Sequence, residues 1–290
     1  VGAAQYSMIC NPTGGIKDDI FIYRLEAERY LLCVNASNLP KIWTWLQNQQ
    51  HNQDEGCILT DRSADLVQLA LQGPVSPEIM RVLGGSQVDG LKLRCCREIS
   101  LSTGKCLVGR TGYTGEFGYE LYFSKSQARE VWDTLLKAGE VYGLKPVGLG
   151  ARDLLRLDMG YFLYGNDLTE NTTPIEAGAE WVVNFEKGAF IGDKRLKGQV
   201  KHGTARRLVG FELIEKGVPR HGMRLLFEGQ EIGQVASGNL SPILQKGIGL
   251  AYVKSSHANI GNTFDVEVRN RRVPAKVVET PFYKKPKKAG

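Results

Sequence analysis

The pattern of hydrophobic and polar positions divides the chain into two parts of different construction. Up to about residue 200, short apolar runs alternate with segments of helical spacing, the clearest of which is 126–143. That segment starts with a serine and ends with a glycine, which predicts a Ser N-cap and a Gly stop. Beyond about residue 205 the helical spacing nearly vanishes, and short strand-like runs alternate with Gly and Asn turns. We therefore predict an α+β region over 1–200 and an all-β domain, a barrel or a sandwich, over 201–290.

The α+β region contains several elements that the pattern predicts individually. In 75–84, Ser76 followed by Pro77 predicts a helix with Ser76 as N-cap and the proline at the first helical position. The region divides near 50–65, which predicts two α+β subdomains. The other elements expected here are strands within 20–36, 65–74 and 105–124 and a helix over 38–50.

Composition changes this picture little. Apolar residues make up 42% of the chain and charged residues 23%, and no apolar run approaches the ~18 residues that span a bilayer. Most of the net charge of +6 comes from the C-terminal tail, where Lys284, Lys285, Lys287 and Lys288 gather. A solvated tail explains them better than a nucleic-acid surface, which needs cations on a folded face. We expect no membrane and no nucleic-acid partner.

The cysteines and histidines predict neither a metal centre nor a thiol nucleophile. The chain has 6 cysteines and 4 histidines, with no CxxC and no metal-type spacing. Cys33 and Cys106 lie in strand-like apolar runs, where a buried free thiol is expected. We infer a reducing compartment: the cytoplasm, or the mitochondrial matrix in a eukaryote. Because the chain opens at Val1 without an initiator Met, we interpret it as a fragment or a processed form.

The glycine-rich stretch GYTGEFGYE, 112–120, allows three readings. It lacks the GKS or GKT of a phosphate-binding loop, and a strand rather than a helix follows it. Spacing therefore predicts a hairpin turn in which glycine supplies positive φ and close backbone approach. In the second strand, Glu120 shares a face with Gly118 and Tyr122. The pattern leaves open whether Glu116 or Glu120 is solvated or turned into a cavity.

Two further groups of charged residues have both a structural and a functional reading. Asp18 and Asp19 point to opposite sides of an extended strand, so they are turn acids unless one of them faces a site. Arg152 and Arg156 lie four residues apart on one helical face. They bind either a ligand carboxylate or internal carboxylates such as Asp158.

A larger set of motifs occurs in a fixed order along the chain: GGIKDDIFIY, VNASN, ALQGP, GRTGYTGEFGYELY, GLGARDLLRLDMGYFLYGNDL, TPIEAGAEWVV, KGAFIGDKRL and GQVASGNLSP. This ordered set closely resembles the aminomethyltransferase, or T-protein, family of the glycine cleavage system, across essentially the whole chain. The resemblance implies a multi-domain folate-binding fold with ferredoxin-like α+β subdomains and a C-terminal antiparallel β-barrel. It also implies that the first subdomain is truncated at its N-terminus.

The resemblance implies a reaction and a site. Members transfer a methylene group from an aminomethyl-lipoyl carrier, the H-protein, to tetrahydrofolate, with release of ammonia and without a metal. Asp19 matches the family's key aspartate beside the reacting edge of the folate, and Glu120 the glutamate that binds the pterin. The remaining pocket positions implied by the resemblance are Tyr6, Tyr23, Asn35, Tyr113, Arg152 and Tyr161. At the C-terminus, Tyr283 or Lys284 closes the cavity; we assign Lys284.

Two related functions remain as alternatives. One is another tetrahydrofolate-dependent one-carbon enzyme of the demethylase type, which usually carries a flavin domain; the chain has no GxGxxG unit. The other is a non-catalytic folate-binding protein like the iron–sulfur assembly relatives. Those carry a KGCYxGQE-type motif, whereas this chain has EKGAFIGDKRL without the cysteine. The motifs favour the transferase.

Overall fold

The computed structural model describes residues 1–53, 56–101, 103–269 and 271–284. Their contacts divide the chain into two compact units, one made of residues 1–7 and 20–149, the other of residues 8–19 and 150–290. The predicted basic tail beyond Lys284 lies outside the described residues. Among the described helices, none is both long and apolar enough to cross a membrane.

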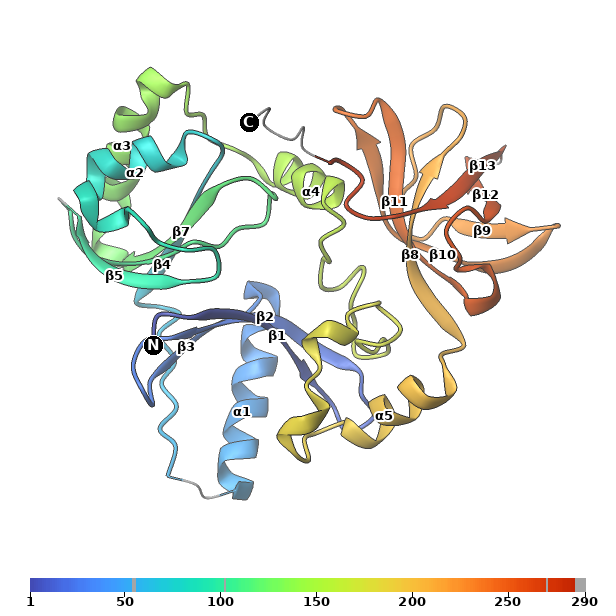
Figure 1. Ribbon diagram of the computed structural model, residues 1–290, viewed down its shortest axis with the longest axis horizontal. Helices are drawn as coiled ribbons and strands as arrows, with labels where there is room; N and C mark the ends of the chain where they lie inside the picture. The colour runs from blue at the N-terminus through green and yellow to red at the C-terminus, as the bar shows by residue number, and fades with distance from the viewer. Residues whose placement is uncertain (54–55, 102, 270, 285–290) are drawn as a thin grey trace. The chain divides into compact units, whose positions relative to one another are not determined.

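A three-stranded sheet begins the chain, in the order β1-β2-β3. Its strands are β1 (Ala4–Cys10), β2 (Ile16–Arg24) and β3 (Tyr30–Cys33), with β2 and β3 paired antiparallel. The helix α1 (Leu39–Gln53) follows β3, as its spacing predicts (Figure 1). Strands β1 and β2 each contribute residues to both units. Strand β2 carries two acids, Asp18 and Asp19, and two aromatic residues, Phe21 and Tyr23.

The second sheet of the first unit is entirely antiparallel and has the order β4-β7-β6-β5. Helices α2 and α3 pack on one of its faces (Figure 1). On β7, Tyr119, Leu121 and Phe123 point into this core, while the alternate residues point to the opposite face. The element bounds are β4 Leu66–Gln72, α2 Ser76–Gly84, β5 Cys96–Leu101, β6 Gly104–Gly109, β7 Gly118–Ser124 and α3 Ala128–Gly139.

The structure corrects two of the expected helix caps. The N-cap of α2 is Val75 rather than Ser76, because the Ser76 hydroxyl donates a hydrogen bond to the Phe117 carbonyl at 3.1 Å instead of capping the helix. The serine cap before α3 belongs to a short 3-10 helix, in which Ser124 accepts from the Ser126 amide, and Gln127 is the N-cap of α3 itself. A tertiary partner competes with the local cap at the first of these sites.

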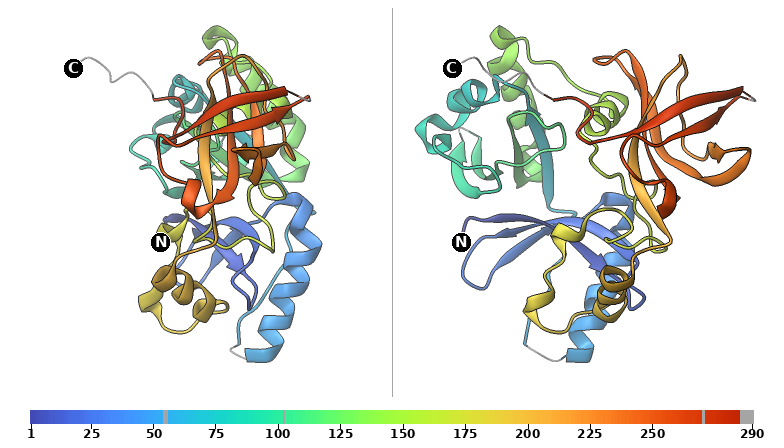
Figure 2. Two further views of the ribbon diagram at one scale, coloured as in Figure 1. Left: turned by 90° about the vertical axis from the view of Figure 1, so that its right-hand side faces the viewer. Right: turned by 45° about the vertical axis from the view of Figure 1, so that its right-hand side comes forward.

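The second unit ends in a closed antiparallel barrel in the order β10-β11-β8-β13-β12-β9, whose curvature Figure 2 shows. The predicted α+β class with a C-terminal β-barrel is therefore confirmed, and of the two all-β forms expected, the barrel is the correct one. An apolar core fills the barrel, with Phe211 and Phe264 edge to face at a centroid distance of 5.7 Å. The bounds are β8 Arg206–Leu213, β9 Arg224–Phe227, β10 Gln230–Ser241, β11 Lys246–Lys254, β12 Thr263–Val268 and β13 Arg271–Val278.

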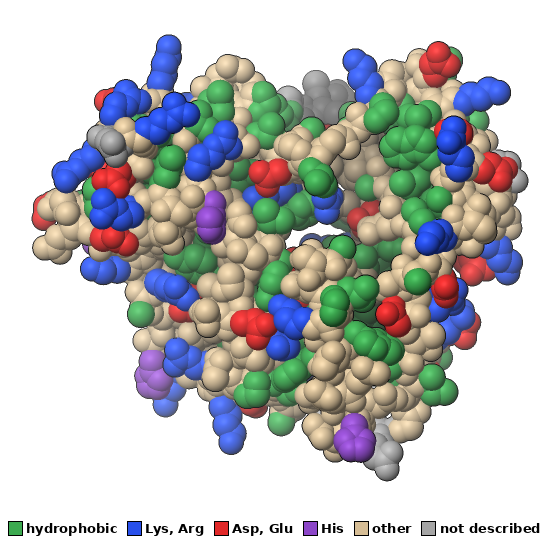
Figure 3. Space-filling model, turned by 180° about the vertical axis from the view of Figure 1, so that it is seen from behind, with side chains coloured by type: hydrophobic (Ala, Val, Ile, Leu, Met, Phe, Trp, Pro, Cys, Tyr) green, Lys and Arg blue, Asp and Glu red, His purple; other side chains and the backbone are tan. Residues whose placement is uncertain are grey.

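Helices α4 (Leu149–Asp158) and α5 (Asp193–His202) precede the barrel. The predicted domain boundary near residue 200 remains a prediction. Neither the division between the two compact units at residues 149 and 150 nor the start of β8 at Arg206 tests it. Charged side chains of both signs stand near one another on the face shown in Figure 3. Ion pairs at the surface, such as Arg224 with Glu267 at 2.8 Å, contribute little stability each.

Candidate functional site

The glycine-rich stretch forms the loop between β6 and β7, as its spacing predicts, and each glycine has a local reason. Gly115 has φ +68°, the left-handed region that favours glycine. A Cβ on Gly112 or Gly118 would lie 2.0 Å or 2.4 Å from the side chain of Gln72. That side chain donates from Nε2 to the carbonyls at both ends of the loop, each at 3.2 Å. The glycines therefore make room for the glutamine that holds the loop.

Glu120 lies on β7 at the centre of a ring of hydrogen bonds. Its Oε1 accepts from Gln68 Nε2 at 2.8 Å, and its Oε2 accepts from Thr111 Oγ1 at 2.5 Å and Tyr23 OH at 3.2 Å. Gln68 Nε2 also donates to Tyr122 OH at 3.0 Å, and the Tyr122 and Tyr23 hydroxyls are 3.1 Å apart. Tyr23 OH is 2.9 Å from Thr111 Oγ1, which closes the ring. We call these residues, Glu120, Gln68, Tyr122, Tyr23 and Thr111, the Glu120 ring.

The ring surrounds the carboxylate with neutral donors rather than cations. Among the residues that the structure describes, no lysine or arginine forms an ion pair with Glu120. Tyr23 and Tyr122 are buried, and desolvation together with the Glu120 charge raises the pKa of both phenols. Both hydroxyls therefore keep their protons at physiological pH and can donate hydrogen bonds within the ring.

Strand pairing explains why these side chains meet. Tyr122 stands opposite Gln68 of β4, and Glu120 lies two residues away on the same face of β7. Opposite Glu120 on β6 is Gly109, where a Cβ would lie 2.8 Å from the Tyr23 ring. The glycine lets the phenol of Tyr23 reach across to the carboxylate.

Five of the predicted site residues belong to the first unit: Tyr6, Tyr23, Asn35, Tyr113 and Glu120. Tyr6 and Phe21 pack edge to face with a centroid distance of 5.8 Å, and Phe21 lies 6.1 Å from Tyr23. The structure thus forms an aromatic row that leads to the Glu120 ring. Asn35 directly precedes the 3-10 helix Ala36–Asn38, and half-buried Tyr113 lies in the β6–β7 loop.

The other predicted residues belong to the second unit: Asp19, Arg152, Tyr161 and Lys284. Asp19 is half-buried on β2, four residues before Tyr23, so the two side chains share one strand face. Its neighbour Asp18 is fully buried on the opposite face, as the strand pattern predicts. Arg152 is exposed on α4, and Lys284 forms an exposed ion pair with Glu279 at 3.2 Å.

Arg156, by contrast, has a structural role. The side chain is 1% exposed and donates to Asp167 at 2.6 Å, to Asp153 at 2.8 Å and to Ser237 of β10 at 2.7 Å. Of the two readings that the sequence leaves open, the internal network is correct for this arginine. It fastens α4 and the segment after it to the barrel.

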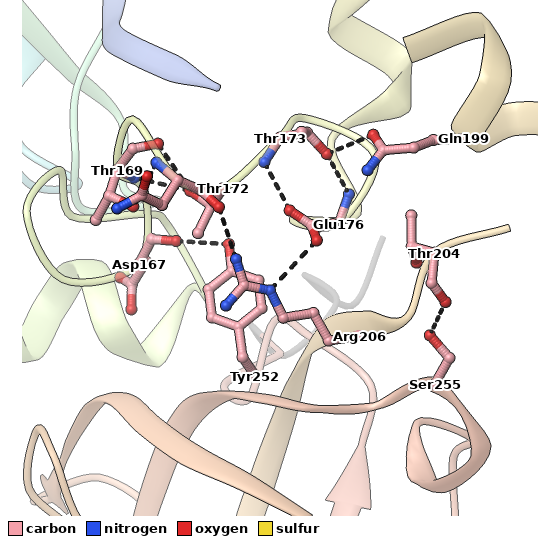
Figure 4. A network of polar contacts seen from close by, with 11 residues as sticks. Asp167, Thr169, Thr172, Thr173, Glu176, Gln199, Thr204, Arg206, Tyr252 and Ser255 are labelled. Atoms are coloured by element: carbon pink, nitrogen blue, oxygen red, sulfur yellow. Dashed lines mark hydrogen bonds and ion pairs between the residues drawn. The ribbon is translucent and has the colours of Figure 1, made fainter. Parts of the chain in front are cut away.

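A second polar network lies around Arg206, where β8 begins (Figure 4). Thr173 and Glu176 form a reciprocal capping arrangement, in which the Glu176 amide donates to Thr173 Oγ1 at 3.1 Å and the Thr173 amide donates to Glu176 Oε2 at 3.0 Å. Glu176 Oε1 also accepts from Arg206 at 3.3 Å, and the guanidinium lies 5.0 Å from the Tyr252 ring centroid. The network joins segment 173–176 to the start of the barrel.

The cysteines and acids give no sign of metal or thiol chemistry in the described ranges. None of the six cysteines forms a disulfide, and no cluster of His, Cys, Asp and Glu in these ranges has the make-up of a metal site. Burial raises the pKa of Cys10 to about 11 and that of Cys106 to about 12, which suppresses the nucleophilic thiolate.

Family models match both parts of the chain. The GCVT N-terminal domain model matches residues 1–187, and the glycine cleavage T-protein C-terminal barrel domain model matches residues 206–284. The chain belongs to the glycine cleavage T-protein family. The resemblance inferred from the motifs is therefore confirmed, and the barrel model matches the described barrel.

Individual members of the T-protein family agree with this assignment. The aminomethyltransferase of Halothermothrix orenii is 44% identical over 281 residues, which cover 97% of this chain and 78% of that relative. The aminomethyltransferase of Bacteroides fragilis is 44% identical over 286 residues, covering 98% and 78%. The crystal structure of glycine cleavage system aminomethyltransferase T from Bartonella henselae has a TM-score of 0.87 at 30% identity and covers 98% of this chain and 76% of that one.

Three members of the Glu120 ring in this T-protein chain escaped the sequence analysis as site residues: Gln68, Thr111 and Tyr122. Of these three, only Tyr122 could have been identified from the sequence, because strand alternation puts it on the same face as Glu120. Gln68 reaches the site through the pairing of β4 with β7, and Thr111 through the folding of the loop over β7. Neither contact has a local pattern that could have identified it.

Proposed function

We propose that the chain transfers the methylene group of an aminomethyl-dihydrolipoyl carrier protein to tetrahydrofolate, giving 5,10-methylenetetrahydrofolate and ammonia. Membership of the T-protein family makes it an enzyme of the glycine cleavage system, an aminomethyltransferase. Tetrahydrofolate is a co-substrate here and supplies the nitrogen that accepts the methylene group. The second partner is the lipoylated H-protein, and the proposed compartment is the cytoplasm.

The Glu120 ring is the observation that carries the folate proposal. A pterin presents a 2-amino-pyrimidinone edge with two adjacent N–H donors, and a carboxylate accepts such a pair in a bidentate, charge-assisted manner. Glu120 has no competing cation among the described residues, and its protein partners are neutral donors. The residue types present therefore fit the pterin edge.

Asp19 would act on the reacting edge of the folate. The residue shares a face of β2 with Tyr23, whose hydroxyl belongs to the Glu120 ring. A carboxylate there orients the folate nitrogens and stabilises positive charge that develops during transfer, without acting as a nucleophile. Holding the carrier's aminomethyl group beside that nitrogen contributes the proximity effect.

The remaining residues would hold the co-substrate along its length. Tyr6, Asn35 and Tyr113 would line the pterin, as the aromatic row between Tyr6 and Tyr23 supports. Arg152 and Tyr161 would contact the folate further along, and Lys284 would close the cavity. No metal takes part in this proposal.

The test is tetrahydrofolate-dependent release of ammonia from aminomethylated lipoyl carrier protein. We expect activity in the wild-type protein, and a rise of roughly tenfold to a hundredfold in the KM for folate in Glu120→Gln, since about 1.5–3 kcal/mol attends a hydrogen bond to a charged group. Glu116→Gln changes the other acid of the same loop and should remain near wild type. Absence of folate-dependent ammonia release from the wild type contradicts the transferase assignment. Unchanged folate affinity in Glu120→Gln contradicts the proposal that Glu120 binds the pterin edge.

A further inference from the structure

Donor directions in the Glu120 ring form a consistent set. The two Nε2 protons of Gln68 go to Glu120 Oε1 and Tyr122 OH, so the Tyr122 proton is available to the Tyr23 hydroxyl. Cys33 Sγ donates to Gln68 Oε1 at 3.6 Å, which favours the amide orientation that turns Nε2 toward Glu120. One Gln68 proton and the Thr111 proton can therefore go to the carboxylate, while the two phenol protons go to Tyr23 and Thr111.

Thr111 determines how much of the carboxylate remains for a ligand. The Tyr23 hydroxyl is 2.9 Å from Thr111 Oγ1 and 3.2 Å from Glu120 Oε2, so the threonine is its nearer acceptor. When Tyr23 donates to Thr111 and Thr111 donates to Glu120, each carboxylate oxygen accepts one hydrogen bond from the protein. A carboxylate offers about four acceptor positions, so one remains on each oxygen. A bidentate ligand edge needs that arrangement.

The ring also restrains the position of the glutamate. Thr111 is 5% exposed and Tyr23 fully buried, so these partners are themselves held by packing. The restraints come from different elements, with Gln68 on β4 and Thr111 in the segment between β6 and β7. A side chain held from both sides loses less conformational entropy when a ligand binds.

We propose that Thr111 and Gln68 are positioning residues, which orient the Glu120 carboxylate so that one acceptor site on each oxygen faces the pterin edge. This inference rests on the folate proposal above, and it assigns to both residues a role that acts through Glu120 without contact with the substrate. Tyr23 and Tyr122 complete the ring. Within the described part of the chain, the titratable side chains in the ring around Glu120 are these two phenols, whose raised pKa values keep them protonated donors, and the Cys33 thiol contacts the ring through Gln68.

The experiment uses the whole protein with Thr111→Val, which keeps the shape but removes the hydroxyl, and Thr111→Ser, which restores it. We expect the tetrahydrofolate Kd, measured by calorimetry, to rise about tenfold in Thr111→Val, because the Glu120 carboxylate loses the restraint that orients it for the ligand. The kcat at saturating folate should stay within about twofold, because the hydroxyl does not contact the reacting atoms. Thr111→Ser should recover the wild-type Kd. Gln68→Met should raise the Kd in the same sense.

A double-variant cycle distinguishes positioning from general structural damage. If Thr111 acts through Glu120, Thr111→Val should add less than about twofold to the Kd of Glu120→Gln. Thr114→Val, which removes the hydrogen bond from Thr114 to Gln72 in the same loop, is the matched control and should leave the Kd unchanged. A full tenfold effect in the Glu120→Gln background, or a wild-type Kd in Thr111→Val, overturns the inference. Failure of the wild type to bind tetrahydrofolate overturns the proposed function itself.

Discussion

Two buried carboxyl groups in the second unit differ from ordinary surface acids. Asp158 is 3% exposed and Asp167 fully buried, and each has a buried Oδ1 without a hydrogen-bond partner among the described residues. Burial raises the pKa of both side chains, although Arg156 partly offsets this for Asp167 and Ser241 for Asp158. Because burial raises the pKa of Asp158, its ionised form weakens the folded state.

We predict that Asp158→Asn changes the pH dependence of stability. A carboxyl group with a raised pKa in the folded state holds its proton after the unfolded chain has released it, near pH 3.9. Stability is therefore lost as pH rises through the folded pKa, and the asparagine variant avoids that loss. Its free energy of unfolding relative to wild type should rise from pH 4 toward neutrality and then level off, in urea titrations across that range. An exposed Asp133→Asn variant measures the background, and a flat difference for Asp158→Asn would contradict this account.

At the scale of elements, strand β10 has a glycine, Gly233, where neighbouring strands of the barrel come close together. The strand pairs with both β9 and β11, and its register shifts next to Gly233. A Cβ on Gly233 would lie 1.9 Å from the Tyr252 carbonyl oxygen, which is backbone and has no freedom to move aside. The close approach of the β11 backbone therefore requires glycine at this position, which also lies beside the register shift with β9.

We predict that Gly233→Ala destabilises the protein by at least about 1–3 kcal/mol, the usual cost of forced overpacking. Gly198→Ala is the matched control, because Gly198 lies in α5 with open space where its Cβ would go. That control should stabilise by up to about 1 kcal/mol, since alanine is the better helix former. Urea unfolding of both variants measures the contrast. Equal stabilities would show that the barrel adjusts at this position.

At the scale of the whole molecule, the proposed folate residues belong to two units of one chain. Asp19 belongs to the second unit and Tyr23 to the first, although both lie on strand β2. A continuous strand therefore connects the proposed reactive acid to the proposed pterin site by covalent structure. A ligand that binds the folded state alone would stabilise the protein as a whole.

We predict that tetrahydrofolate raises the thermal midpoint of the wild-type protein as its concentration increases. At a concentration a hundredfold above Kd, the gain in the free energy of unfolding should be about 2.7 kcal/mol. Glu120→Gln should show a much smaller shift at the same concentration, because its Kd is higher. Differential scanning calorimetry under reducing conditions measures both proteins. An active wild type whose midpoint ignores tetrahydrofolate would contradict this linkage.

The sequence by itself determined most elements and the family. Periodicity located α1, β4 and the β6–β7 hairpin, because each has a regular spacing of apolar residues and a glycine or proline near its end. It also put Glu120 and Tyr122 on one face, because side chains alternate along a strand. The ordered motifs carried the family resemblance, which no single motif could support.

Tertiary structure alone decided what each polar side chain contacts. The Ser76 hydroxyl donates to the Phe117 carbonyl instead of capping α2. Arg156 is buried, whereas Arg152, one turn earlier on the same helix, is exposed. Gln68 and Thr111 reach Glu120 from 52 and 9 residues away. Local spacing specifies which face a residue occupies, whereas hydrogen-bond partners depend on pairing between distant strands. For that reason the sequence could place Glu120 and Tyr122 on one strand face, and only the fold could show the ring of hydrogen bonds around Glu120.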